Sequence, residues 1–250
     1  MIDWAADPQV PGAGVSMLQR LARSHDFLYS IGGSKATASI LPKLGFRIPA
    51  QALTFACPIR PWRQVFQHQD RSLRLPLRLL RNIWWSEIPA RRRTPAWTAI
   101  ERLAQGDQVP AVLTRERCVG FFEYLEKCPS ARFQSFHILE RGRKSGFFSL
   151  AYIAGQARVA GVWLENPDVS CWRVAFQLAQ KAALTYSDAS EIVARTTGEA
   201  SAIAASQAGM RLRGQAPVFL FRRASTSRLL PLQFQMVDND EVFLKTGFVA

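Results

Sequence analysis

The chain has 250 residues, of which 48% are hydrophobic and 20% are charged, which is typical of a folded globular protein and excludes a disordered chain. No apolar run approaches the roughly 20 residues of a membrane-spanning helix, and the first residues lack the basic start of a secretory signal, so we expect neither feature. The formal net charge of +13 suits nucleic acid, an anionic membrane surface or a phosphate-rich ligand as a partner.

The 4 cysteines and 3 histidines share no metal-binding spacing, and the sequence contains no C-x-x-C pair. We therefore expect no metal site, reduced thiols and a cytoplasmic location.

A glycine-containing loop, Gln9-Val10-Pro11-Gly12-Ala13-Gly14, lies near the start of the chain and precedes an alternation of helices and strands. In chain order the pattern predicts a helix at 15–25, a strand at 27–31, a helix at 35–45 and a strand at 51–59. Ser34 is the expected N-cap of the second helix, Gly45 is its expected end, and Pro42 should shorten or kink its last turn. This order is typical of an α/β protein.

Residues 60–93 hold the densest basic stretch of the chain, with nine arginines against only Asp70 and Glu87. If Pro76 is accommodated, four of the arginines fall on one face of a helix that ends at Trp84 and Trp85, namely Arg71, Arg74, Arg78 and Arg81. Two interpretations remain open. The helix is either a linker packed between two domains with solvated arginines, or a basic amphipathic helix that lies on an anionic membrane.

From residue 98 the globular pattern resumes, with an amphipathic helix at 114–128 and meandering strands over 131–165. Turns are expected at 142–146 and 155–156. The remaining pattern predicts a helix at 171–186, a strand at 190–196, a helix at 199–209, a strand at 216–223 and one or two strands within 230–244.

The chain also shows an internal repeat. DWAADPQV at 3–10 aligns with VWLENPDV at 162–169, at an offset of 163 − 4 = 159 from Trp4 to Trp163. Further on, residues 45–61 align with 209–225, at an offset of 209 − 45 = 164. The shared order of strand end, loop, helix, strand, helix, glycine and strand predicts a duplication.

The two copies differ in the loop. Gly12 and Gly14 align with Cys171 and Arg173, whose side chains would hold backbone N–H groups away from a phosphate. The first copy is therefore expected to cradle a pyrophosphate, and the second is not.

These residues resemble the GNAT superfamily of acyl-CoA-dependent N-acyltransferases, whose loop has the form (Gln or Arg)-x-x-Gly-x-(Gly or Ala) between a strand and a helix. Gln9-x-x-Gly12-x-Gly14 fits every specified position, and Lys43-Leu44-Gly45-Phe46 resembles the Gly-Phe ending of the following strand–helix unit. The resemblance covers residues 2–58 directly and 98–250 through the repeat. It implies an α/β (α+β) fold of two GNAT-like units, with domains at 1–58, 59–97 (a basic linker) and 98–250.

The resemblance also implies the site residues. The backbone of the loop and first helical turn would bind the pyrophosphate of acetyl-CoA, Gln9 would shape the loop, and Ser34 is a further contact; the cofactor-binding set is Gln9, Val10, Gly12, Ala13, Gly14, Val15 and Ser34. Leu41 stands where the family commonly has a tyrosine that protonates the leaving thiolate. Asp3 is the candidate general base, its alternative being a solvated N-terminal acid.

The resulting hypothesis is a cytoplasmic N-acetyltransferase that moves an acetyl group from acetyl-CoA to an amine, with the acceptor and the oligomeric state left open. Only a short strand precedes the loop, so the first unit lacks its initial strands. We expect a fragment, a misassigned start or another segment that completes the sheet, and the activity of the truncated chain is left open. The alternative is a non-catalytic binding protein that docks to nucleic acid or an anionic membrane through residues 60–93.

Overall fold

A computed structural model describes residues 12–63, 75–91, 94–96, 98–102, 125, 127–222 and 234–236. The chain divides into two compact units. Unit 1 comprises Met1–Leu53 and Gln215–Gln233, and unit 2 comprises Thr54–Gly214 and Phe234–Ala250. Two long strands, β2 (Arg47–Pro58) and β8 (Arg211–Arg222), each have residues in both units. The domain ranges expected from the sequence stay a prediction.

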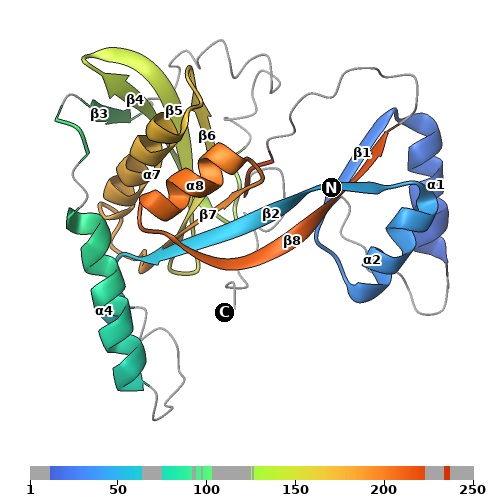
Figure 1. The fold of residues 1–250 in the computed structure, drawn as a ribbon, viewed down its shortest axis with the longest axis horizontal. Coiled ribbons are helices and arrows are strands. Elements are labelled where there is room, and N and C mark those ends of the chain that lie inside the picture. Colours follow the sequence, from blue (N-terminus) through green and yellow to red (C-terminus); the bar gives the residue numbers. More distant parts are fainter. Residues whose placement is uncertain are drawn as a thin grey trace. The chain divides into compact units, whose positions relative to one another are not determined.

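Unit 1 has the predicted order of helix, strand, helix and strand. Its elements are α1 (Ala13–Ser24), β1 (Phe27–Ile31), α2 (Lys35–Ile40), the 3-10 helix η1 (Leu41–Leu44) and the first part of β2. The second part of β8 lies between β1 and β2 and is antiparallel to β1, with Phe27 opposite Arg222 and Ile31 opposite Val218. Figure 1 shows α1 and α2 beside this sheet.

Local residues set the helix ends in unit 1. Ser34 caps α2 as predicted, because its hydroxyl accepts a hydrogen bond from the Thr37 N–H at 3.2 Å. The helix expected over 35–45 is divided at Ile40, where the tighter η1 begins, since Pro42 has no N–H to continue the α-helical ladder. Gly45 ends η1 at φ 88°, a left-handed conformation that favours glycine.

The core of unit 1 is a small apolar cluster. Leu41, Phe46 and Phe219 are buried, and Leu18 and Leu28 pack against them from α1 and β1. This packing fixes α1 against the sheet and so holds the N-terminus of that helix in place.

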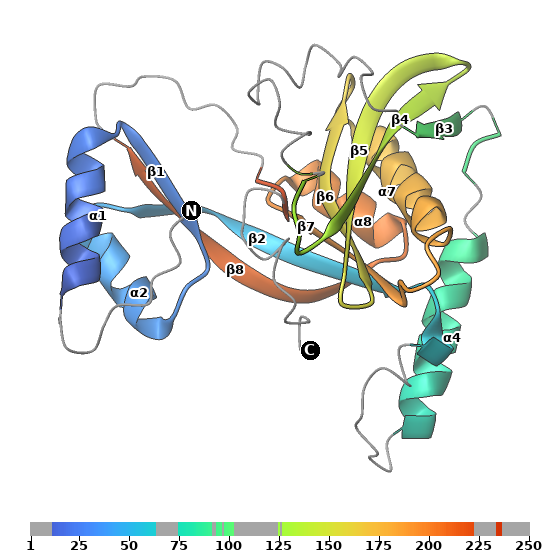
Figure 2. The same ribbon diagram turned by 180° about the vertical axis from the view of Figure 1, so that it is seen from behind.

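Unit 2 is built on a mixed sheet in the order β2-β7-β6-β5-β4-β3. Its other elements are α4 (Leu75–Arg91), β3 (Thr98–Arg102), β4 (Arg132–Glu140), β5 (Arg143–Ile153), β6 (Gln156–Leu164), α7 (Val169–Ala183), β7 (Glu191–Thr196) and α8 (Glu199–Gln207). The meander predicted over 131–165 is confirmed, with β4, β5 and β6 antiparallel and joined by tight turns at Gly142 and Gly155. Helices α7 and α8 lie side by side on one face of the sheet (Figures 1 and 2).

One core cluster of unit 2 includes the buried residues Phe133, Ile153, Val193 and Met236. The helix predicted over 114–128 lies almost entirely outside the described residues. Among the described residues, no helix is both long and apolar enough to cross a membrane.

Helix α4 corresponds to the predicted basic helix. It begins at Leu75 and accommodates Pro76 in its first turn, where the missing N–H has no intrahelical partner to lose. Arg71 and Arg74, the first two arginines of the predicted face, lie outside the described residues.

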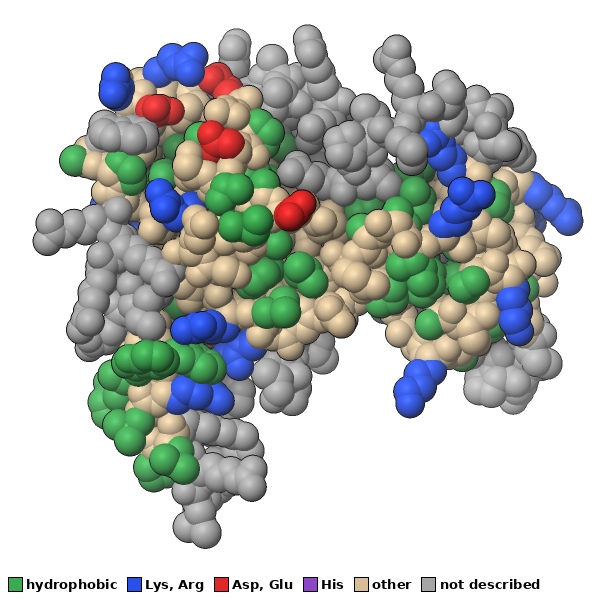
Figure 3. Space-filling model, viewed as in Figure 1, with side chains coloured by type: hydrophobic (Ala, Val, Ile, Leu, Met, Phe, Trp, Pro, Cys, Tyr) green, Lys and Arg blue, Asp and Glu red, His purple; other side chains and the backbone are tan. Residues whose placement is uncertain are grey.

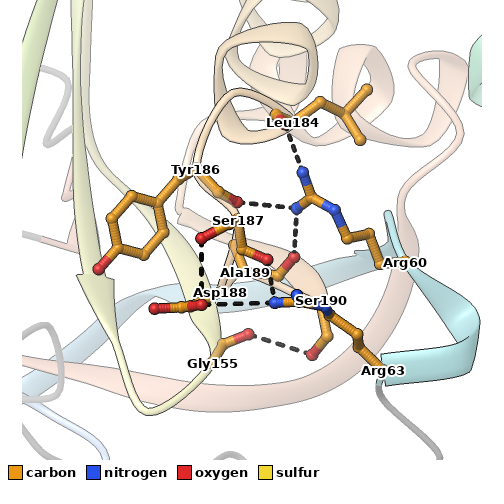
Figure 4. Close-up of polar contacts among 9 residues, drawn as sticks. All are labelled: Arg60, Arg63, Gly155, Leu184, Tyr186, Ser187, Asp188, Ala189 and Ser190. Atoms are coloured by element: carbon orange, nitrogen blue, oxygen red, sulfur yellow. Dashed lines mark hydrogen bonds and ion pairs between the residues drawn. The ribbon is translucent and has the colours of Figure 1, made fainter.

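The first arginines of the basic segment bind their own chain (Figure 4). The Arg60 guanidinium donates hydrogen bonds to the carbonyls of Leu184, Tyr186 and Ala189, which follow the C-terminus of α7. Arg63 lies beside it and forms an ion pair with Asp188 at 3.4 Å. Burial, together with the neighbouring Arg63, lowers the pKa of Arg60. Arg60 thus donates to carbonyls at and after the helix end, and the Tyr186 carbonyl also accepts the Ala189 N–H at 3.4 Å.

Candidate functional site

The N-terminus of α1 has the features of an anion site. Gly12 is the N-cap residue, with φ 86° and ψ −4°, and its carbonyl accepts a hydrogen bond from the Ser16 N–H at 3.0 Å. Among the described residues no side chain caps the helix, and its first turn contains no acid. The N–H groups of the first turn lie at the positive end of the helix dipole. Within the described chain they have no side-chain acceptor, which leaves them able to bind an anion.

Among the described residues, the space around Gly12 is open. A Cβ atom built on this residue would have no described atom within 4 Å, but the left-handed backbone disfavours any L side chain there. Glycine is required at this position by conformation, and Gly12 is exposed.

Of the predicted cofactor-binding residues, Gly12, Ala13, Gly14 and Val15 lie together at this helix end. Ser34 lies elsewhere, at the start of α2, where its hydroxyl is bonded to Thr37. Gln9, Val10 and the candidate base Asp3 fall outside the described residues. Leu41 is buried in the core of unit 1 and offers no group that could protonate a thiolate.

A cavity of about 250 Å³ lies further along α1, between this helix and η1. Arg23 and Lys43 supply its cationic groups, and Leu18, Leu44 and Phe46 supply apolar surface. A basic pocket on the same helix as the open N-terminus suits a ligand with more than one phosphate.

The N-terminus of α7 in unit 2 is closed by its own side chain. Asp168 is the N-cap, and its carboxylate accepts hydrogen bonds from the Cys171 N–H at 2.7 Å and from the Ser170 hydroxyl at 2.8 Å. The bond from the Cys171 backbone is the main cause of the lowered pKa of Asp168. A negative charge already occupies the place where a phosphate would bind, so unit 2 lacks an anion site at this helix.

A second cavity, of about 410 Å³, adjoins Asp168 in unit 2. Its lining includes the carboxylates of Glu140, Glu165 and Asp168, while Arg143 is held in an ion pair with Glu165 at 3.0 Å. The acids make this cavity unfavourable for a phosphate. These acidic residues were not predicted from the sequence, although an aspartate directly before an apolar helical run is a local signal for an N-cap at Asp168.

Strands β6 and β7 separate beyond Val159, and we call this opening the β6–β7 fork. The parallel pairing runs from Gln156 opposite Glu191 to Val159 opposite Ala194. A register shift against β5 leaves an extra residue, Ala160, in β6 at the same point. A bulge bends and twists its strand, which accounts for the separation from β7.

Gln235 fills the β6–β7 fork. Its side-chain amide donates a hydrogen bond to the Val162 carbonyl at 2.8 Å and accepts one from the Val162 N–H. Its backbone pairs with Thr196 on β7. The adjacent Phe234 N–H bonds the Thr197 hydroxyl at 2.9 Å, and Met236 is fully buried. Gln235 therefore provides hydrogen-bond partners for the backbone groups of Val162 that the fork would otherwise leave unpaired.

The structure is similar to two solved acetyltransferases. A GCN5-related N-acetyltransferase from Anabaena variabilis matches with a TM-score of 0.52 and 10% sequence identity, over 84% of this chain and 50% of that chain. A GCN5-related N-acetyltransferase from Kribbella flavida matches with a TM-score of 0.53 and 13% identity, over 86% of this chain and 76% of that chain. The chain thus spans half the length of the Anabaena protein.

At these identities the likeness is one of fold, and the chain has the fold of the GCN5-related N-acetyltransferases. The α/β fold and the GNAT resemblance expected from the sequence are confirmed at this level. Neither the family models nor the curated proteins compared with the chain gave a sequence match. The duplication and the incomplete first unit stay predictions.

Proposed function

We propose that the protein is an acyl-CoA-dependent N-acyltransferase and that unit 1 binds the coenzyme. The observation that carries the proposal is the open start of α1 at Gly12, on a GNAT fold. Helix α7 provides the contrast within the same chain, because its Cys171 N–H is bonded to the Asp168 carboxylate. Of these two helices, only α1 has room and charge for a phosphate.

The residues of α1 fit the coenzyme in two places. The N–H groups of Ala13, Gly14 and Val15 would bind the pyrophosphate, with Gln9 and Val10 supplying the preceding loop. The cavity between α1 and η1, with Arg23 and Lys43, would bind the phosphorylated ADP end. Acetyl-CoA would supply a thioester whose acyl carbon accepts the attack of an amine.

Unit 2 is proposed to have a structural role. The pantetheine arm of a CoA ester carries amide groups, and an open strand edge is the kind of surface that binds them. In unit 2 the corresponding backbone groups of Val162 are already bonded to Gln235. The acidic cavity beside Asp168 adds a charge barrier to the same ligand.

The proton chemistry is proposed to depend on Asp3. An amine must lose a proton as it forms the amide, and the departing thiolate must gain one. Leu41 has no exchangeable proton, so the thiolate would take its proton from the solvent. The acceptor is proposed only as a primary amine, on a small molecule or on a protein.

The activity test measures release of free CoA thiol from acetyl-CoA in the presence of amino acids, amino sugars and lysine-containing peptides. Amine-dependent release that Asp3→Asn lowers and Asp26→Asn leaves unchanged would support the assignment. The assignment would be contradicted if no amine stimulated the release of CoA thiol and if Gly12→Asp left that release unchanged.

A further inference from the structure

Helix α4 presents an apolar stripe to the outside of unit 2. Leu77, Leu80 and Trp84 are exposed by 70%, 65% and 63%, and their spacing of three and four residues places them on one face. The opposite side of the helix holds Asn82, which is buried, and the half-buried Trp85 lies between this side and the stripe. In Figure 3, hydrophobic side chains cover the outer surface of α4. The stripe is therefore an exposed face of a helix whose other side is packed.

Arginines gather beside this stripe. The guanidinium carbons of Arg81, Arg213 and Arg211 lie 4.5, 5.5 and 5.9 Å from the ring centroid of Trp85. The ion pair described within this group is the one between Arg213 and Glu191, at 3.6 Å. We call Arg81, Arg211 and Arg213 the arginine cluster. Arg213 and its partner Glu191 are largely buried, so Arg81 and Arg211 supply the exposed positive charges of the cluster. In Figure 3, Lys and Arg side chains adjoin the apolar atoms of α4.

We propose that the Leu77–Leu80–Trp84 stripe and the arginine cluster dock unit 2 onto an anionic lipid bilayer. A bilayer surface offers an apolar phase for the leucines, an interfacial layer that suits tryptophan, and phosphates for the arginines. The membrane was one of two interpretations of the basic segment, and the outward stripe on α4 supports it. This inference does not depend on the proposed acyltransferase activity.

Two other occupants fit the surface less well. A nucleic acid would pair with the arginines, but its phosphate backbone leaves the exposed leucines without an apolar contact. A second copy of the chain would cover the leucines, but a symmetric contact would bring two arginine clusters together in a protein of net charge +13. Charge complementarity together with the apolar stripe therefore favours the lipid surface.

The test is co-sedimentation of the full chain with vesicles of equal parts phosphatidylglycerol and phosphatidylcholine, compared with vesicles of phosphatidylcholine alone. Binding is expected only with the anionic vesicles. The triple variant Leu77→Ser, Leu80→Ser, Trp84→Ser is expected to lower the partition coefficient at least about tenfold. Arg211→Gln is expected to lower it about fivefold.

A matched control replaces exposed apolar residues of other elements, in the triple variant Ile48→Ser, Leu184→Ser, Ile203→Ser. This control is expected to bind anionic vesicles as the wild type does. The variant Trp84→Phe keeps an apolar ring and should still bind, while losing most of the blue shift in tryptophan fluorescence that the vesicles induce.

The proposal would be overturned if the wild type bound both kinds of vesicle equally or bound neither. It would also be overturned if the α4 triple variant bound anionic vesicles as well as the wild type does. So would a dimer, seen by sedimentation velocity without lipid, that the same variant dissociates. Retention on duplex DNA that the α4 triple variant abolishes would assign the surface to nucleic acid instead.

Discussion

The side-chain amide of Gln235 forms hydrogen bonds with both the N–H and the carbonyl of Val162, as a neighbouring strand would. The bond from Gln235 Nε2 to the Val162 carbonyl is 2.8 Å long. One side chain thus closes the edge of β6 at the point where β7 moves away. This relationship joins the C-terminal part of unit 2 to the middle of its sheet.

Replacing Gln235 with alanine should leave two buried backbone groups of Val162 without partners. We expect the free energy of unfolding to fall by about 2–4 kcal/mol. The Val162 amide should also exchange its hydrogen much faster, because that N–H loses its acceptor. Denaturant titration and hydrogen exchange measure the two effects, and Gln215→Ala on the exposed part of β8 is the control. Unchanged protection of the Val162 amide would contradict the contact.

Asp168→Ala should remove the N-cap of α7 and cost about 1 kcal/mol of stability at pH 7. Hydrogen bonds from Cys171 and Ser170 lower the pKa of Asp168. The carboxylate therefore stabilises the fold fully above its unfolded pKa of about 4, and this contribution is lost as the pH falls through the lower folded value.

The two variants of Asp168 should differ in their response to acid. The difference between wild type and Asp168→Ala should shrink below pH of about 4, as measured by thermal unfolding across pH. Asp168→Asn can still accept the Cys171 and Ser170 hydrogen bonds at Oδ1 without titrating, but its Nδ2 cannot accept the bond from the Asn166 amide. It should therefore be more stable than Asp168→Ala at pH 7 and lose less stability in acid than the wild type. A pH-independent gap between wild type and Asp168→Ala would contradict this account.

Arg60→Met keeps the apolar stem of the side chain and removes the donors to Leu184, Tyr186 and Ala189. We expect a loss of about 1–3 kcal/mol, since the carbonyls after α7 lose a charged partner. Amide hydrogens in the last turn of α7 should exchange faster. Arg143→Met serves as the control, because its ion pair with Glu165 is exposed and should contribute less than about 1 kcal/mol. Equal effects of the two variants would refute the role of Arg60.

Tyr152 should make the fold sensitive to alkaline pH. Burial raises its pKa to about 12, and this effect outweighs the opposing Arg132 guanidinium. The folded pKa lies above the unfolded value of about 10, so the contribution of the neutral phenol is present below that pH and lost as the pH rises through the folded value.

Tyr152→Phe keeps the ring stacked on Tyr186, whose centroid lies 4.2 Å away. Among the described residues the Tyr152 hydroxyl has no hydrogen-bond partner, so the change should cost less than about 0.5 kcal/mol at pH 7. The variant should also lose less stability than the wild type between about pH 10 and 12. Identical alkaline unfolding curves for the two proteins would show that the phenol does not titrate as proposed.

The elements that the sequence predicts well are those whose ends are set by local residues. Ser34 and Gly45 bracket the second helix of unit 1, and both act as expected. The glycine turns at Gly142 and Gly155 likewise locate the β4–β5 and β5–β6 hairpins. In each case the residue type itself predicts the end of the element, because the residue supplies either the required backbone conformation or the capping hydrogen bond.

The features that the sequence does not predict depend on partners far along the chain. Strands β2 and β8 begin at Arg47 and Arg211, several residues before the apolar runs that predict them, because their first residues are mostly exposed and mix polar with apolar side chains. The role of Gln235 depends on a fork formed more than seventy positions earlier at Val162. The Gly12 loop was recognised from its residue spacing, but its preceding part lies outside the described chain.

The central claim, that α1 binds acyl-CoA, is tested most directly by calorimetric titration of acetyl-CoA into the wild type, Gly12→Asp and Gly142→Asp. Both glycines have a positive φ, 86° and 81°, and both would place a Cβ in open space, so the two variants carry the same conformational strain. We predict a dissociation constant between about 1 µM and 1 mM for the wild type and for Gly142→Asp. Binding by Gly12→Asp should be weaker by more than about tenfold, because its carboxylate would occupy the helix end as Asp168 does on α7. The absence of binding by the wild type, or equal binding by both variants, would contradict the account.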